Sequence, residues 1–198
     1  MNEFKNCLKN RDAWITVFIY DRVAVLILRC LVLFKFNKSA SRISYFGFIC
    51  CLIATILILK EQYIFSIIFL QLITIVDCVD GKWARYTNTS SDYGVLLDCA
   101  IDLYAHFVLG LFILSKLYFF DTLLFFAYGI NVFLLGALHT WGLMNPSAPK
   151  YSPVKADSKW DSWTAKNRLT AVPVSEVELA FLVPSLVLTY MAGIDVIW

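Results

Sequence analysis

Four aspartates lie inside or at the edges of apolar runs in the stretch IVDCVDGKWARYTNTSSDYGVLLDCAIDLYAHF, residues 75–107. Asp77 and Asp80 are three residues apart, so on a helix they share one face. Asp98 and Asp102 are four residues apart and form a stripe on the following helix. If these two faces pack together, the four carboxylates come within a few ångströms of one another.

Carboxylate charges this close together in apolar surroundings need cations or protons that compensate them. One ionised aspartate deep in a membrane costs about 2.5–3.5 kcal/mol. When several carboxylates lie together, their mutual repulsion favours protonation of some of them unless cations neutralise their charge. Clustered oxygen ligands suit hard divalent ions, and two such ions balance four carboxylates. Lys82 or Arg85 could pair with a single aspartate, but four aspartates, with Gly81, Ala84 and Gly94 keeping the site open, favour a metal site.

The composition around this cluster is typical of a membrane protein. The chain is 60% hydrophobic and 16% aromatic, and its mean hydropathy is +0.69. Soluble domains are nearer 45–50% apolar. A net charge of +2 without long charged runs gives no indication of nucleic-acid binding. The six cysteines form no CxxC pair, so no disulfide framework is expected.

Five apolar stretches are each close to the roughly 20 residues that cross about 30 Å of hydrocarbon as a helix. They show no period-two alternation, and in lipid this leaves helices as the spanning elements. The stretches are 43–59, 62–79, 93–115, 119–143 and 174–198. The sequence therefore predicts an all-α integral membrane protein.

A sixth apolar stretch, residues 13–34, contains Asp21, Arg22 and Arg29. Arg11, Arg22 and Arg29 share one helical face, which predicts an amphipathic helix lying in the membrane interface. If this helix lies on the cytoplasmic surface and the five others span, fifteen of the 17 lysines and arginines are on one side. The positive-inside rule favours this topology.

We expect one membrane-embedded domain over 1–198, with a cytoplasmic and interfacial part over 1–42 and a transmembrane bundle over 43–198. The 144–173 loop holds four of the five prolines and is expected in the cytoplasm. The aspartates then straddle the cytoplasmic ends of two neighbouring helices.

One longer pattern combines these residues: Asp77-x2-Asp80-Gly81-x2-Ala84-Arg85-x8-Gly94-x3-Asp98-x3-Asp102. It matches the signature of the CDP-alcohol phosphotransferase family (class I CDP-alcohol phosphatidyltransferases), which the chain therefore resembles. The stretch SASRISYFGF, residues 39–48, is also similar to the first spanning helix of the family, with Ser44 where threonine is common. The resemblance covers residues 37–115 best.

The resemblance implies transfer of a phospho-alcohol group from a CDP-alcohol donor to a hydroxyl acceptor, with release of CMP and dependence on two Mg²⁺ or Mn²⁺ ions. It implies metal ligation by Asp77, Asp80, Asp98 and Asp102, with Asp102 also the catalytic general base. It implies CDP binding by Asp80, Gly81, Ala84, Arg85 and Gly94. Relatives usually have six spanning helices, so five to six are expected after the amphipathic helix.

The resemblance also implies a homodimer surrounded by membrane lipids, in the inner membrane of a prokaryotic cell, with its active site facing the cytoplasm. A role in phospholipid biosynthesis follows, with CDP-diacylglycerol and a polar or phosphorylated polyol acceptor slightly preferred. The alternative is a CDP-linked small head group that is passed to a lipid or polyol acceptor.

Two other functions compete with this one. A divalent-cation transporter or channel would also explain carboxylates in apolar helices, but it does not need Gly81, Ala84 and Arg85. A catalytically inactive scaffold is disfavoured because every signature aspartate is present. His106 continues the Asp102 stripe, and a buried structural histidine is preferred over a role in positioning the acceptor.

Overall fold

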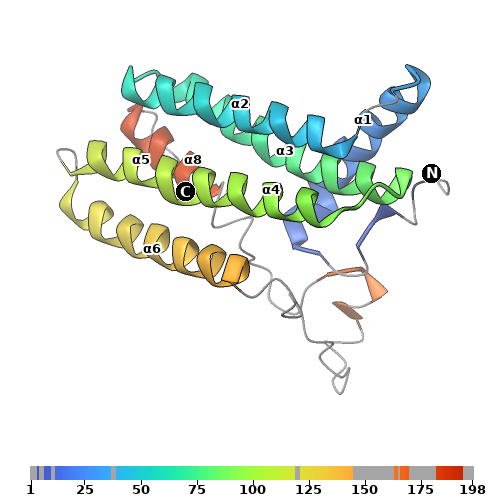
Figure 1. Cartoon of the computed structure of the whole chain (residues 1–198). Helices are drawn as coiled ribbons and strands as arrows, with labels where there is room; N and C mark the ends of the chain where they lie inside the picture. The colour runs from blue at the N-terminus through green and yellow to red at the C-terminus, as the bar shows by residue number, and fades with distance from the viewer. Residues whose placement is uncertain are drawn as a thin grey trace.

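The computed structural model describes residues 4, 7–9, 12–36, 39–118, 121–144, 163–164, 166–169 and 182–193, and these form a helical bundle (Figure 1). The predicted all-helical class is confirmed for this part of the chain. In chain order the elements are η2 (Thr16–Tyr20), α1 (Asp21–Leu33), α2 (Ala40–Leu59), α3 (Tyr63–Thr87), α4 (Asp92–Leu103), η3 (Tyr104–Val108), α5 (Leu109–Leu117), α6 (Thr122–Met144) and α8 (Val183–Met191).

Three helical stretches are long and apolar enough to cross a membrane, namely Ala40–Leu59, Tyr63–Thr87 and Asp92–Leu117. They correspond to three of the five predicted spanning stretches, and Thr122–Ala137 is a shorter apolar helix in a fourth. In the fifth, the described helix is α8, with 9 residues. The total of five to six spans and the interfacial position of the N-terminal helix remain predictions.

Helices α2 and α3 reverse direction through a short turn and pack along their length (Figure 1). Gly47 permits this close approach, because a Cβ there would lie 3.1 Å from Cγ1 of Val76. The reversal puts the start of α2 beside the end of α3. Asn88, with a left-handed φ of 52°, then ends α3.

The next helix starts at the same end of the bundle. The Ser91 side chain accepts a hydrogen bond from the backbone N–H of Gly94 at 3.1 Å, which caps α4. The end of α3 and the beginning of α4, where the four aspartates lie, are therefore neighbours in space.

Polar side chains also join helices inside the apolar bundle. The Tyr20 hydroxyl donates to Oε1 of Gln71 at 2.7 Å, and Nε2 of Gln71 donates to the Ser185 hydroxyl at 2.9 Å. This chain of hydrogen bonds connects η2, α3 and α8 and satisfies the amide of Gln71 at both ends. It therefore ties the N-terminal helix and α8 to the same residue of α3.

Helices α5 and α6 approach each other through glycines. A Cβ added at Gly110 would lie 2.8 Å from Cγ2 of Val132, closer than real Cβ contacts. Gly129 faces the same interface with more room, since its Cβ would be 3.6 Å from Cδ1 of Leu114.

These two glycines give a matched test of the helix contact. We expect Gly110→Ala to destabilise the protein by about 1–3 kcal/mol, because the new methyl overpacks against buried Val132. Gly129→Ala should be neutral or slightly stabilising, since alanine is the better helix former. The thermal unfolding midpoints of both variants in detergent test this, and equal midpoints would contradict the packing described.

Candidate active site

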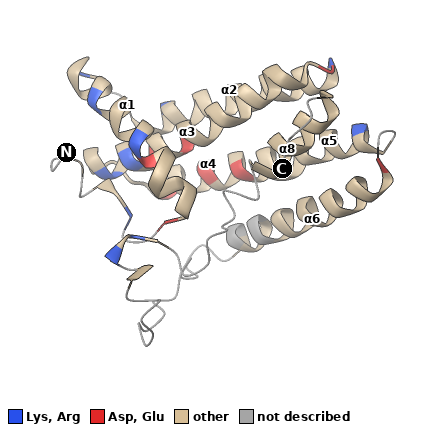
Figure 2. Cartoon of the chain, turned by 180° about the vertical axis from the view of Figure 1, so that it is seen from behind, with Lys and Arg blue, Asp and Glu red and all other residues tan. Residues whose placement is uncertain are grey.

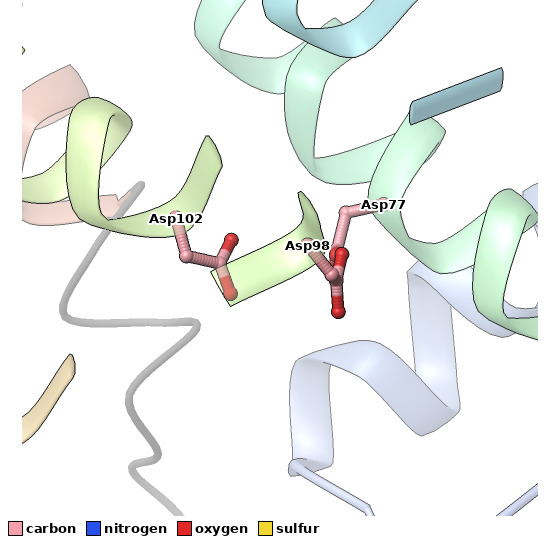
Figure 3. Close-up of side chains that lie close together, drawn as sticks. All are labelled: Asp77, Asp98 and Asp102. Carbon is pink, nitrogen blue, oxygen red and sulfur yellow. The ribbon is translucent and has the colours of Figure 1, made fainter. Parts of the chain in front are cut away.

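Asp77 and Asp80 lie on the last turns of α3, and Asp98 and Asp102 on α4. Asp77, Asp98 and Asp102 each offer one carboxylate oxygen, and these three oxygens lie within 4.8 Å of one another. All three side chains are half-buried. Figure 3 shows them converging from the two helices on one space.

The fourth aspartate lies beside this group but outside it. Asp80 is 6% exposed, and its Oδ2 accepts a hydrogen bond from the Ser44 hydroxyl of α2 at 2.6 Å. Asp80 and the other three aspartates all line one small cavity of about 10 Å³. The packing of α2, α3 and α4 therefore brings all four predicted metal ligands to one place.

The geometry of the three converging oxygens fits a hard divalent cation. Mg²⁺ binds oxygen at about 2.0–2.1 Å and Ca²⁺ at about 2.3–2.6 Å, so ligands on opposite sides of one ion are roughly 4–5 Å apart. An oxygen spread of 4.8 Å matches this. Carboxylates are the donors such ions prefer, so Asp77, Asp98 and Asp102 suit the metal that the family signature implies.

A second cavity of about 180 Å³ adjoins the first and shares Ser44, Asp80 and Asp98 with it. The five residues predicted to bind CDP all line it: Asp80, Gly81, Ala84, Arg85 and Gly94. Its remaining walls come from the start of α2 and from the turn over residues 89–91. The small side chains on α3 and α4 leave this space open.

Arg85 forms part of this cavity and also holds the N-terminal segment. Its Nε donates to the carbonyl oxygen of Cys7 at 2.6 Å. Its guanidinium lies over Gly81, where an added Cβ would be 3.5 Å from Nη1. The arginine is thus held at Nε, while its terminal nitrogens lie beside Gly81, which also lines the cavity.

Lys82 faces away from the aspartate cluster. It is 3% exposed, and its Nζ forms an ion pair with Oδ1 of Asp21 at 2.7 Å. Two residues along a helix turn about 200°, so Lys82 and Asp80 point to opposite sides of α3. Arg168 contacts the other oxygen of Asp21, with Nη2 2.9 Å from Oδ2. Asp21 is therefore a buried ion-pair centre that joins α1, α3 and residues 166–169.

Sequence patterns did not predict the partners of Asp21 and Ser44. The sequence places Asp21 in an amphipathic helix expected at the membrane interface, but in the structure Asp21 is only 4% exposed. A lone acid in an apolar stretch is a signal for a buried partner, but its spacing does not indicate which cation pairs with it. The bond from Ser44 to Asp80 depends on the register between α2 and α3, which sequence periodicity leaves open.

His106 is buried, at 6% exposure, and lies in η3. A π-helical turn takes more residues than an α-helical one, so the four-residue stripe through Asp98 and Asp102 does not continue along the same line. His106 is not among the residues that line either of the two cavities described above. This placement agrees with the preference for a structural histidine.

The described helices and the acidic cavity are those of a membrane protein with a site for charged chemistry at one end of its bundle. The model of the CDP-alcohol phosphatidyltransferase family matches residues 37–194, which is most of the chain. The chain therefore belongs to the CDP-alcohol phosphatidyltransferase family. No curated protein matches it. As a member of this transferase family, it transfers a phosphoalcohol from a CDP-alcohol to an acceptor.

The Asp21 centre yields a stability prediction. Asp21→Asn removes the charge that compensates buried Lys82, so we expect a loss of about 3–5 kcal/mol in the free energy of unfolding. Asp92→Asn, at an exposed position in the first turn of α4, is the control and should cost less than about 1 kcal/mol. Chemical denaturation in detergent measures both, and equal small effects would show that the ion pairs are not needed for stability.

Proposed function

We propose that the chain is a metal-dependent CDP-alcohol phosphotransferase whose active site is formed by the two adjoining cavities at the ends of α3 and α4. The observation that carries this proposal is the convergence of Asp77, Asp98 and Asp102 beside the cavity lined by Arg85. Two Mg²⁺ or Mn²⁺ ions, held by these aspartates and by Asp80, would neutralise the diphosphate and the charge that develops during transfer.

The protein side chains then have separate roles. Gly81, Ala84 and Gly94 leave room for the CDP part of the donor, and Arg85 binds one of its phosphates. Asp102 lies one helical turn beyond Asp98 and accepts the proton of the acceptor hydroxyl. The acceptor oxygen bonds to the phosphorus of the phosphoalcohol. The bond from this phosphorus to the bridging oxygen breaks, and CMP leaves with the electron pair.

An apolar groove that shares Val76 with the small aspartate cavity supports a lipid donor. It has a volume of about 500 Å³, and helices α1, α2 and α3 form its walls. Its lining is apolar except for Arg42, and it includes Val76 and Val79, which are chain neighbours of Asp77 and Asp80. A groove of this size suits an acyl chain, and Arg42 can bind a lipid phosphate. We therefore favour CDP-diacylglycerol as donor and a polar or phosphorylated polyol as acceptor.

The charge distribution supports an active site that faces the cytoplasm. Figure 2 shows basic residues gathered around α1 and the end of the bundle that carries the acidic site. At the far end, Lys116 forms an exposed ion pair with Glu61 at 2.8 Å. This distribution follows the positive-inside rule. We therefore propose that the N-terminal helix lies on the cytoplasmic surface of a prokaryotic inner membrane and that five to six spanning helices follow it. A homodimer, as expected for the family, completes the proposal.

The direct test is release of CMP. Purified protein with Mg²⁺ or Mn²⁺ is incubated with a panel of CDP-alcohols and candidate acceptors. We expect CMP only when donor, acceptor and metal are all present, and EDTA should abolish it. Metal flux in liposomes without CMP from any pair would favour the transporter instead.

Asp102→Asn tests the role of the base. The amide cannot accept the proton, so we expect turnover to fall by about 10²–10⁴-fold. Binding of the CDP-alcohol should be largely retained, because the other aspartates and Arg85 remain. Turnover and equilibrium CDP binding are measured on the same preparation. An equal loss in both would contradict the proposed role as base.

The lipid groove has its own matched pair of variants. Ile27 lines the groove, whereas its neighbour Leu26 is 58% exposed and does not. Ile27→Trp should fill the groove and raise KM for CDP-diacylglycerol about tenfold, the effect of a misfit worth about 1.4 kcal/mol. Leu26→Trp should leave this KM unchanged. Unchanged KM values in both variants would exclude the groove as part of the donor site.

A further inference from the structure

The hydrogen bond between Ser44 of α2 and Asp80 of α3 lies where the two cavities of the site meet. The Ser44 hydroxyl is 2.6 Å from Oδ2 of Asp80, and both residues line the small aspartate cavity as well as the larger cavity predicted to bind CDP. Both side chains are buried, so bulk water competes little for this contact. Helix α2, which carries none of the four aspartates, therefore contributes a polar group to the predicted metal site.

The proton of the Ser44 hydroxyl is donated to Asp80. The Ser44 oxygen also lies 3.4 Å from the backbone carbonyl oxygen of Ala40, but a hydroxyl has one proton to donate. A distance of 2.6 Å is typical of a hydrogen bond from a hydroxyl to a charged carboxylate, which is about twice as strong as a neutral one. The shorter contact is therefore the main hydrogen bond, and it holds Oδ2 of Asp80 against α2.

The orientation of Asp80 determines how easily it can bind a cation. An ionised carboxylate has two oxygens with about four acceptor positions, and the Ser44 hydroxyl occupies one of them. A side chain that rotates freely loses conformational entropy when it binds a metal, whereas one already held in place loses less. Groups that orient a metal-binding carboxylate in this way typically contribute about 10–100-fold to metal affinity.

We propose that Ser44 is a positioning residue that orients the Asp80 carboxylate for a divalent cation. The inference rests on the proposed function, because it takes Asp80 as a metal ligand of the transferase. Ser44 acts through Asp80, and it does so by its hydroxyl rather than by the volume of its side chain.

Equilibrium binding of Mn²⁺ to the purified protein tests this without any turnover. Electron paramagnetic resonance of free Mn²⁺ gives the dissociation constant. We expect Ser44→Ala to weaken Mn²⁺ binding about tenfold, because Asp80 loses the group that orients it. In the CMP assay, the same variant should need about tenfold more Mn²⁺ for half-maximal release. It should keep most of its turnover once Mn²⁺ is saturating.

Threonine and valine at position 44 separate the effect of the hydroxyl from that of side-chain shape. The two residues are both branched at Cβ and similar in size, but only threonine can donate a hydrogen bond to Asp80. Ser44→Thr should therefore bind Mn²⁺ with nearly wild-type affinity, whereas Ser44→Val should be as weak as Ser44→Ala. Equal Mn²⁺ affinities in Ser44→Thr and Ser44→Val would overturn the proposal, because the hydroxyl would then make no difference.

Ser66→Ala is the matched control for the removal of a buried hydroxyl from the bundle. Ser66 is fully buried, and its hydroxyl lies within hydrogen-bond distance of the backbone carbonyl oxygens of Ala54 and Gln62. It is not among the residues that line either cavity of the site. Its removal should leave Mn²⁺ affinity unchanged, and a loss equal to that of Ser44→Ala would contradict a specific role for Ser44.

The results for the wild type separate this inference from the proposed function. If the wild type binds Mn²⁺ and Ser44→Ala binds it equally well, the role of Ser44 is wrong and the metal-dependent transferase stands. If the wild type binds no Mn²⁺, both the role of Ser44 and the metal dependence are wrong.

Discussion

Repulsion between carboxylates is the constraint on which the site depends. The oxygens of Asp77, Asp98 and Asp102 lie within 4.8 Å of one another, at the ends of apolar helices. Like charges this close in surroundings of low polarity are unfavourable unless cations or protons compensate them. Helix packing enforces the proximity, because Gly47 lets α2 and α3 approach closely and Ser91 starts α4 beside the end of α3. The fold thus holds the carboxylates in an electrostatically unfavourable arrangement, and bound divalent ions would remove the repulsion between them.

A second set of charges, on the other side of α3 from the aspartate cluster, attaches neighbouring segments to this helix. Asp21 is buried between Lys82 and Arg168, and these contacts attach α1 and residues 166–169 to α3. Trp14, which precedes η2, and Trp163 add an aromatic contact between the N-terminal part and residues 163–169, with ring centroids 6.0 Å apart. Leu169 is fully buried in this assembly. Segments that are far apart in the sequence therefore pack together beside α3.

The sequence predicted the parts of the site that depend on spacing within one helix. Intervals of three and four residues placed the aspartates on two faces, and the small residues from Gly81 to Gly94 indicated an open space beside them. Contacts between distant segments were not predictable in this way. The pairing of Asp21 with Lys82 and the bond from Ser44 to Asp80 depend on how helices dock. The π-helical turn after Leu103 could not be predicted either, because no hydrophobic periodicity in the sequence marks it.

Direct counting of bound Mn²⁺ tests the central claim, that the converging aspartates hold divalent ions. Electron paramagnetic resonance of free Mn²⁺ gives the number of ions bound per chain in the presence of CDP. Our account predicts two ions for the wild type, as in other two-metal sites, and weaker binding with fewer ions for Asp98→Asn. Mn²⁺ binding that is absent from the wild type, or that is unchanged in Asp98→Asn, would contradict the account.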